Sequence, residues 1–219
     1  MRKITKSAAV VASLVILTAG FSTIAQAAPT KAPSKVNCKK TNAKGHSVKN
    51  ITPPEVKTPF KNRTFTLKTN CGEIVIEADG VKAPVTVIAL AALANGGFFN
   101  QTICHRLTTN NIYVLQCGDP TATGSGGPNF SYRDENLPQA AQANYPAGVV
   151  AMANSGANTN GSQFFIVYED TSLPPSYTIW GKVTKGLEIV QSIAKEGVIN
   201  GKSDGLPKRT IAIEKVKVR

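Results

Sequence analysis

The sequence predicts one sizeable domain built on an antiparallel β-sheet that is closed on itself or folded into a sandwich. Short segments rich in β-branched and aromatic residues recur along the chain, separated by clusters of Gly, Pro and Asn. Only two stretches carry the length and end signals of helices, too few for the alternating strands and helices of a parallel sheet. With 219 residues, 42% of them hydrophobic, the chain can bury a substantial core.

A hairpin is expected to open the domain. Phe65 and Leu67 lie before the turn-forming sequence Thr69-Asn70-Cys71-Gly72, and the apolar run 74–76 follows it. A helix is predicted next, because Pro84 begins an apolar run, 85–93, that ends before Gly96.

A second helix is expected at 187–196, where Gly197 would end it. The remaining segments have strand composition and lie between turn-forming residues. They are Tyr113–Gln116, Gly148–Met152, Phe164–Val167, Thr178–Val183 and Ile211–Val218.

Residues 1–27 are typical of an export signal. Basic residues at positions 2, 3 and 6 precede an apolar run, 8–24, and Ala25-Gln26-Ala27 fits the rule for signal-peptide cleavage. The run is short for a membrane span, although an uncleaved membrane helix is the alternative. We expect cleavage, and a mature chain that is secreted or extracytoplasmic.

Residues 28–63 form a basic lead-in before the domain, which we place at 64–219. Nine Lys and Arg residues in this segment face a single acid, Glu55, so it accounts for most of the net charge of +12. Five prolines and little apolar periodicity predict a mostly flexible segment. It is either a solvated linker or a segment that makes electrostatic contact with an anionic cell envelope.

The charge of the folded part argues against nucleic acid as a partner, because residues 64–219 are nearly neutral. The Gly-rich stretch 123–128 lacks the Lys-Ser/Thr of a phosphate-binding loop, which disfavours nucleotide binding.

Four cysteines in an exported chain predict two disulfides rather than a metal site. There is no C-x-x-C pair, and the only histidines are His46 and His105, so we expect no metal. Cys104 and Cys117 flank a hairpin-like stretch around 108–111, which favours their pairing and leaves Cys38 for Cys71. The spacing does not exclude the other two connectivities.

One block of sequence carries the clearest functional signal. The stretch Met152-Ala153-Asn154-Ser155-Gly156-Ala157-Asn158-Thr159-Asn160-Gly161-Ser162-Gln163-Phe164-Phe165-Ile166 occurs together with His105-Arg106-Leu107 and Gln116-Cys117-Gly118-Asp119. These motifs closely resemble the cyclophilin family of peptidyl-prolyl cis-trans isomerases, and the resemblance extends from 64 to 219. It implies an all-β fold, a closed eight-stranded antiparallel barrel capped by two α-helices, with the substrate groove on the outer surface.

The resemblance also implies the site residues. Arg106 matches the catalytic arginine, and the apolar pocket for the proline ring would comprise Tyr113, Val114, Phe165 and Leu173. Substrate backbone would be held by Gln116, Asn154 and Gln163 and by main chain at Gly124 and Ala153, while Tyr177 stands where the family often has His. The loop between Arg106 and Gln116 is about two residues longer than the common pattern, and Tyr113 replaces a usual Phe. No cofactor is implied.

The expected function is therefore an isomerase that accelerates rotation about Xaa-Pro bonds while exported proteins fold. Its partners would be proline-containing polypeptides, and it would act as a monomer. The alternative is an extracellular binding or chaperone module on the same barrel, in which isomerisation is incidental.

Overall fold

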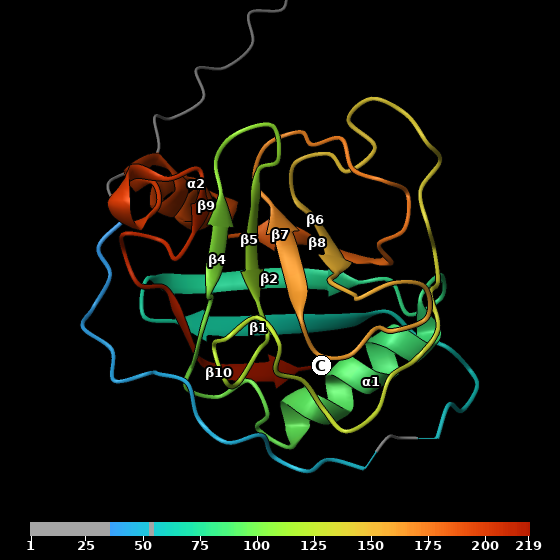
Figure 1. The fold of residues 1–219 in the computed structure, drawn as a ribbon. Helices are drawn as coiled ribbons and strands as arrows, with labels where there is room; N and C mark the ends of the chain where they lie inside the picture. The colour runs from blue at the N-terminus through green and yellow to red at the C-terminus, as the bar shows by residue number, and fades with distance from the viewer. Residues whose placement is uncertain (1–35, 53–54) are drawn as a thin grey trace, which may run out of the picture. The chain divides into compact units, whose positions relative to one another are not determined.

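The computed structural model describes residues 36–52 and 55–219 (Figure 1). The expected signal peptide, 1–27, lies outside the described residues. The elements are β1 (Arg63–Thr69), β2 (Gly72–Ala78), α1 (Pro84–Asn95), β3 (Thr102–Ile103), β4 (Arg106–Thr108), β5 (Val114–Cys117), β6 (Val149–Met152), β7 (Phe164–Val167), β8 (Ile179–Lys185), α2 (Leu187–Glu196), a 3-10 helix (Ile199–Gly201), β9 (Asp204–Gly205) and β10 (Ala212–Val218). Each predicted strand and helix overlaps an observed one, with ends that differ by up to two residues.

All strands in the part of the chain that the structure describes belong to one curled antiparallel sheet of order β3-β10-β1-β2-β8-β6-β7-β5-β4-β9. In Figure 1, β1, β2 and β10 run nearly across β4, β5 and β7, so the sheet folds over onto itself. The expected all-β barrel with two α-helices is confirmed in this form. The count of eight strands and the closed ladder are corrected: the sheet has ten strands, and its edges are β3 and β9.

The difference arises at residues 102–108. This extended stretch is interrupted at Cys104 and His105, so that its first part, β3, pairs with β10 and its second part, β4, pairs with β5. The two ends of the sheet are therefore connected covalently, through residues 104 and 105, and not by hydrogen bonds between β3 and β4. The short strand β9 then adds to the free edge of β4.

The hairpin β1–β2 forms as predicted, in continuous register from Arg63↔Ala78 to Thr69↔Gly72. Gly72 has φ +130°, a value that side-chain-bearing residues rarely adopt, so glycine suits this end of the turn. Apolar residues alternate along β1 and β2 and face the core, which period-two patterning requires.

The two helices lie at opposite ends of the sheet (Figure 1). Pro84 begins α1, and the carboxylate of Glu135 caps it by accepting hydrogen bonds from the backbone N–H groups of Val85 (3.2 Å) and Thr86 (3.0 Å). A carboxylate at this end also complements the helix dipole. Helix α2 buries only one face, through Ile189, Val190 and Ile193.

The main core fills the concave side of the sheet. Its largest buried side chain is Trp180, which packs edge-on against Phe65 and Phe164, with ring centroids 5.3 and 5.8 Å apart. This cluster joins both helices to β1, β2, β8 and β10. We call the side of the sheet that faces it the inner face.

Part of the lead-in, residues 36–52, packs against the domain, although we expected the segment to be mostly flexible. Residues 36–52 have no regular secondary structure, yet Val36, Val48 and Ile51 pack against the main core. The backbone N–H of His46 donates to the carbonyl of Pro120 (2.8 Å). A few well-spaced apolar residues therefore hold the segment against the domain, while its lysines remain exposed. Within residues 36–52 and 55–219, no helix is both long enough and apolar enough to cross a membrane.

Both predicted disulfides are present. Cys38–Cys71 joins the lead-in to the β1–β2 turn, next to a hydrogen bond from the N–H of Lys39 to the carbonyl of Asn70 (2.8 Å). Cys104–Cys117 joins the β3–β4 junction to the end of β5. Disulfides favour an extracytoplasmic location.

Candidate active site

Strand alternation places a second set of side chains on the outer face of the sheet. Leu115 and Phe164 face the main core, whereas Val114 and Phe165, their neighbours in sequence, belong to a separate outer cluster. Cross-strand pairs bring Arg106 of β4 opposite Gln116 of β5, and Gln116 opposite Phe165 of β7. Three of the predicted site residues thus stand side by side on adjacent strands.

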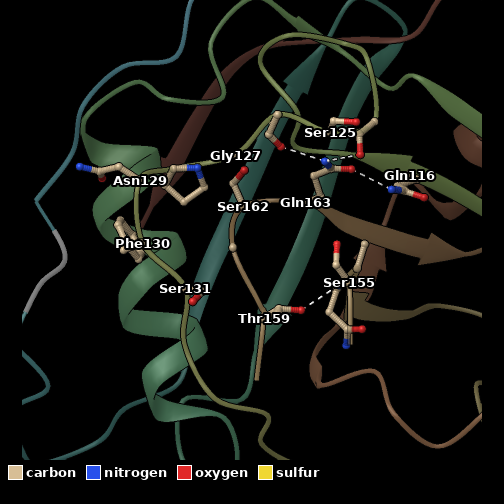
Figure 2. A pocket seen from close by; sticks show the side chains of 16 residues that line it. Gln116, Ser125, Gly127, Asn129, Phe130, Ser131, Ser155, Thr159, Ser162 and Gln163 are labelled. Atoms are coloured by element: carbon tan, nitrogen blue, oxygen red, sulfur yellow. Dashed lines mark hydrogen bonds between the residues drawn. The ribbon is translucent and has the colours of Figure 1, made fainter. Parts of the chain in front are cut away.

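A chain of hydrogen bonds connects the polar residues of this face. The Nη1 of Arg106 donates to Oε1 of Gln116 (3.2 Å), and Nε2 of Gln116 donates to Oε1 of Gln163 (2.8 Å). The Nε2 of Gln163 donates to the carbonyls of Gly124 (2.9 Å) and Gly126 (2.8 Å). Figure 2 shows Gln163 between Gln116 and the loop that carries Ser125 and Gly127. These contacts fix the rotamers of both glutamines, because each amide has a partner at both ends.

The glycine-rich loop is shaped by a buried carboxylate. Asp119 accepts hydrogen bonds from the backbone N–H groups of Thr121 (2.7 Å), Gly124 (2.7 Å) and Gly126 (3.1 Å). Burial acts to raise the pKa of Asp119, but hydrogen bonds from Thr121 and the glycines outweigh it and hold this pKa below its usual range. The loop is therefore preorganised around a charged Asp119 at neutral pH.

A polar pocket of about 550 Å³ opens beside this loop (Figure 2). Five residues predicted from the motif line it: Gln116, Gly124, Ala153, Asn154 and Gln163. The side chain of Asn154 is occupied, since its Nδ2 donates to the carbonyl of Ser176 (2.8 Å). The N–H of Ala153 donates to the carbonyl of Gln163 (2.9 Å).

An apolar surface adjoins the polar chain. The outer cluster comprises Val114, Tyr145, Val149, Ala151, Phe165 and Val167, and five partly exposed residues pack on it: Ile112, Ala153, Leu173, Tyr177 and Ile179. The rings of Phe165 and Tyr177 meet edge to face, with centroids 5.5 Å apart. The structure therefore brings together the predicted Val114, Phe165, Leu173 and Tyr177.

Tyr113 does not join them. Its ring packs against Tyr168 of the main core, at a centroid distance of 6.0 Å, and lines a different pocket that Gln191 of α2 also borders. Ile112 packs on the outer cluster in its place. Alternation accounts for this, because Tyr113 directly precedes Val114, whose side chain packs in the outer cluster, so the side chain of Tyr113 points to the opposite side.

Two further residues of the site were missed from the sequence. The hydroxyl of Tyr145 is hydrogen-bonded to both backbone groups of Tyr177, its N–H (3.0 Å) and its carbonyl (3.1 Å), so it fixes the loop that carries Leu173. Tyr145 is fully buried, and desolvation raises its pKa to about 12.

The second missed residue is Asp204. Its carboxylate accepts two hydrogen bonds from Arg106, from Nε at 2.8 Å and from Nη2 at 2.7 Å. These hydrogen bonds raise the pKa of Arg106 and lower that of Asp204. Arg106 thus stays charged. A lone Asp 98 residues away, on the short strand β9, gives no sequence signal for this contact.

His105 lies beside Arg106. Burial lowers its pKa below the usual 6.5, and this outweighs the opposite effect of the Asp119 carboxylate. His105 is therefore neutral at neutral pH. In the part of the chain that the structure describes, no group of three or more His, Cys, Asp or Glu residues is placed to hold a metal ion.

Comparison with known proteins gives consistent results. Residues 64–218 match the family model described as cyclophilin type peptidyl-prolyl cis-trans isomerase/CLD. The chain is 42% identical over 197 residues to the probable peptidyl-prolyl cis-trans isomerase B of Mycobacterium leprae, covering 84% of this chain and 67% of that one. It is 40% identical over 194 residues to the Mycobacterium tuberculosis protein of the same name, covering 82% and 63%. The chain thus spans about two thirds of the length of these relatives.

Solved structures agree with the fold. A crystal structure of a Cryptosporidium parvum cyclophilin type peptidyl-prolyl cis-trans isomerase superposes with a TM-score of 0.61 at 29% identity, covering 73% of this chain and 98% of that one. A second structure of that protein, in the presence of the dipeptide Ala-Pro, has a TM-score of 0.60 at 29% identity and covers 71% and 98%.

Proposed function

The chain belongs to the cyclophilin-type peptidyl-prolyl cis-trans isomerase family, and from this premise we propose that it accelerates Xaa-Pro isomerisation in exported polypeptides, acting as a monomer. The observation that carries the proposal is the hydrogen-bonded chain that ends at Arg106, directly beside a partly exposed apolar cluster. A charged donor next to an apolar seat suits a twisted prolyl amide, which has a polar nitrogen and an apolar ring.

The reaction breaks no covalent bond. Rotation about the amide bond loses resonance, so the barrier is about 18–20 kcal/mol, and unassisted isomerisation takes tens to hundreds of seconds. In the twisted state the lone pair localises on the prolyl nitrogen. A site that binds this state more tightly than either planar form lowers the barrier.

Arg106 supplies the differential interaction. Its guanidinium can donate a hydrogen bond to the localised lone pair, an interaction that the planar amide cannot accept equally well. Since its pKa is raised, it remains a charged donor at every working pH. Its hydrogen bond to Gln116 joins it to the polar chain of the site before substrate arrives.

The other predicted residues bind and orient the substrate. Ile112, Val114, Phe165, Leu173 and Tyr177 would hold the proline ring, and Gln116 and Gln163 would hold the chain on its amino side together with main chain at Gly124, Ala153 and Asn154. The Cryptosporidium relative crystallised in the presence of Ala-Pro supports a small Xaa-Pro unit as ligand.

A protease-coupled assay on a Xaa-Pro peptide tests the proposal. Arg106→Ala should lower kcat/KM at least 100-fold, the usual loss for one transition-state donor. Arg209→Ala is the matched control, because Arg209 makes a similar two-point ion pair with Glu196 outside the site, and it should keep wild-type activity. Full activity in Arg106→Ala would contradict the assignment, and a wild type that does not exceed the uncatalysed rate would favour the binding-module alternative.

Export and envelope contact form the second part of the proposal. Two disulfides support an oxidising compartment, and the exposed Lys39, Lys40, Lys44 and Lys49 support electrostatic contact with anionic envelope polymers. Exchange of these four lysines for glutamine should weaken retention on envelope preparations at low salt. Retention that is insensitive to both salt and the exchange would contradict this part.

A further inference from the structure

The contact between Asp204 and Arg106 is the strongest unexplained feature of the site. Two hydrogen bonds, of 2.7 and 2.8 Å, join one carboxylate to the Nε and Nη2 of one guanidinium. The Asp204 side chain is about half exposed. Ion pairs of this exposure contribute little to the stability of the fold. The contact is therefore better explained by an effect on the active site.

Backbone pairing fixes Asp204 beside β4, two residues along the strand from Arg106. Strand β9 pairs with β4, which sets Asp204 opposite Thr108, and the N–H of Thr109 donates to the carbonyl of Ser203 (2.9 Å). Asp204 lies within the segment 198–207, whose two ends are joined by the bridge between Val198 and Pro207. The carboxylate therefore projects from a segment whose backbone is held in place by hydrogen bonds.

The hydrogen bonds that Arg106 makes within the protein determine which of its N–H groups are free to bind substrate. Asp204 takes the side edge of the guanidinium, formed by Nε and Nη2, while Gln116 accepts from Nη1. Arg has five N–H donors in a rigid planar fork. Two donors, one on Nη1 and one on Nη2, are then left for a substrate, and the plane of the fork is held from both sides.

We propose that Asp204 is a positioning residue for the isomerase reaction, which acts by orienting Arg106 toward the prolyl nitrogen. The inference rests on the proposed function. Without Asp204 the long Arg106 side chain keeps only its contact with Gln116 and samples other rotamers, so a smaller fraction of molecules has a donor in place when the amide twists. The effect belongs to the transition state, hence to kcat rather than KM.

Steady-state kinetics of Asp204→Ala, Asp204→Asn and Glu196→Ala test this. Asp204→Ala should lower kcat about tenfold with KM within twofold, and Asp204→Asn should fall between it and wild type, because the amide keeps one acceptor oxygen. Glu196→Ala is the matched control, since it removes the carboxylate of the similar pair with Arg209, and it should leave kcat unchanged.

NMR of the Arg106 Nε–H group separates positioning from a general loss of structure. Its exchange with water should be slow in wild type and faster in Asp204→Ala, while backbone resonances outside 198–207 stay in place. If Asp204→Ala does not fold, Asp204→Asn provides the same two measurements.

Two results would overturn the inference: kcat within twofold of wild type in the Asp204 variants, or a lower kcat with Nε–H exchange still slow. Failure of the proposed function is distinguishable, because then wild type itself shows no catalysis.

Discussion

Phe164 and Phe165 are neighbours on β7 and are buried to the same degree, 3% and 4% exposed, yet they belong to different regions of the molecule. Phe164 packs on the inner face with Trp180 and Phe99, whereas Phe165 packs on the outer face with Tyr145 and Tyr177. Burial alone therefore does not separate the core from the site. The neighbours do, because Phe165 lies opposite Gln116 on the outer face, beside the partly exposed Leu173 and Tyr177, whereas Phe164 belongs to the main core.

The largest expected effect tests this division directly. Phe164→Ala should lower the free energy of unfolding by about 3–5 kcal/mol, because it leaves a cavity in a closed core. Phe165→Ala should lose less stability but at least tenfold in kcat/KM, since it removes part of the proposed proline seat. Urea unfolding and the isomerase assay measure the two quantities, and equal stability losses with equal activities would refute the division.

The disulfide Cys104–Cys117 provides the next test. Both cysteines are buried in the main core, on the inner face of the sheet. Cys104 lies just before β4 and Cys117 ends β5, the strands that carry Arg106 and Gln116 on the outer face. Replacing both by Ser should lower stability by about 3 kcal/mol, the value for a loop of this length. Activity measured well below the melting temperature should stay within a few-fold of wild type, because the β4–β5 ladder remains. A large loss of activity in a folded variant would mean that the disulfide itself sets the geometry of the site.

A smaller effect distinguishes Ile112 from Tyr113. Ile112→Ala should lower kcat/KM about tenfold, because it removes part of the proposed apolar seat for the proline ring. Tyr113→Ala is the matched control in the adjacent position, and its effect should fall mainly on stability, since its ring packs on Tyr168. The reverse order of activities would restore the original prediction for Tyr113.

The sequence contained enough information for much of this arrangement. Proline and glycine signals located both helices, and the block around Gln163 and Phe165 identified the outer face because those residues lie together in one motif. Asp204 could not be found in this way, since its role depends on β9 reaching the edge of β4 across 98 residues. Ile112 was missed because the motif match does not show which of Ile112 and Tyr113 faces the outer cluster, and this depends on the local direction of the backbone. The packing of residues 36–52 was missed because the prediction used the average composition of the segment. The contacts depend on three individual residues, Val36, Val48 and Ile51.

The smallest expected effect concerns the pH dependence of stability. His105 directly precedes Arg106 and lies against Gly124 of the glycine-rich loop, and burial lowers its pKa below 6.5 in the folded protein. The unfolded chain therefore binds a proton first as the pH falls, and the folded state loses stability below about pH 6.5. Replacement by glutamine, which does not titrate there, should flatten the dependence between pH 7.5 and 5.5, as measured by urea unfolding. Between pH 7.5 and 8.5 the imidazole is neutral in both states, so wild type and His105→Gln should show equal slopes in that control interval. An equally steep loss of stability in His105→Gln below pH 6.5 would place the titrating group elsewhere in the molecule.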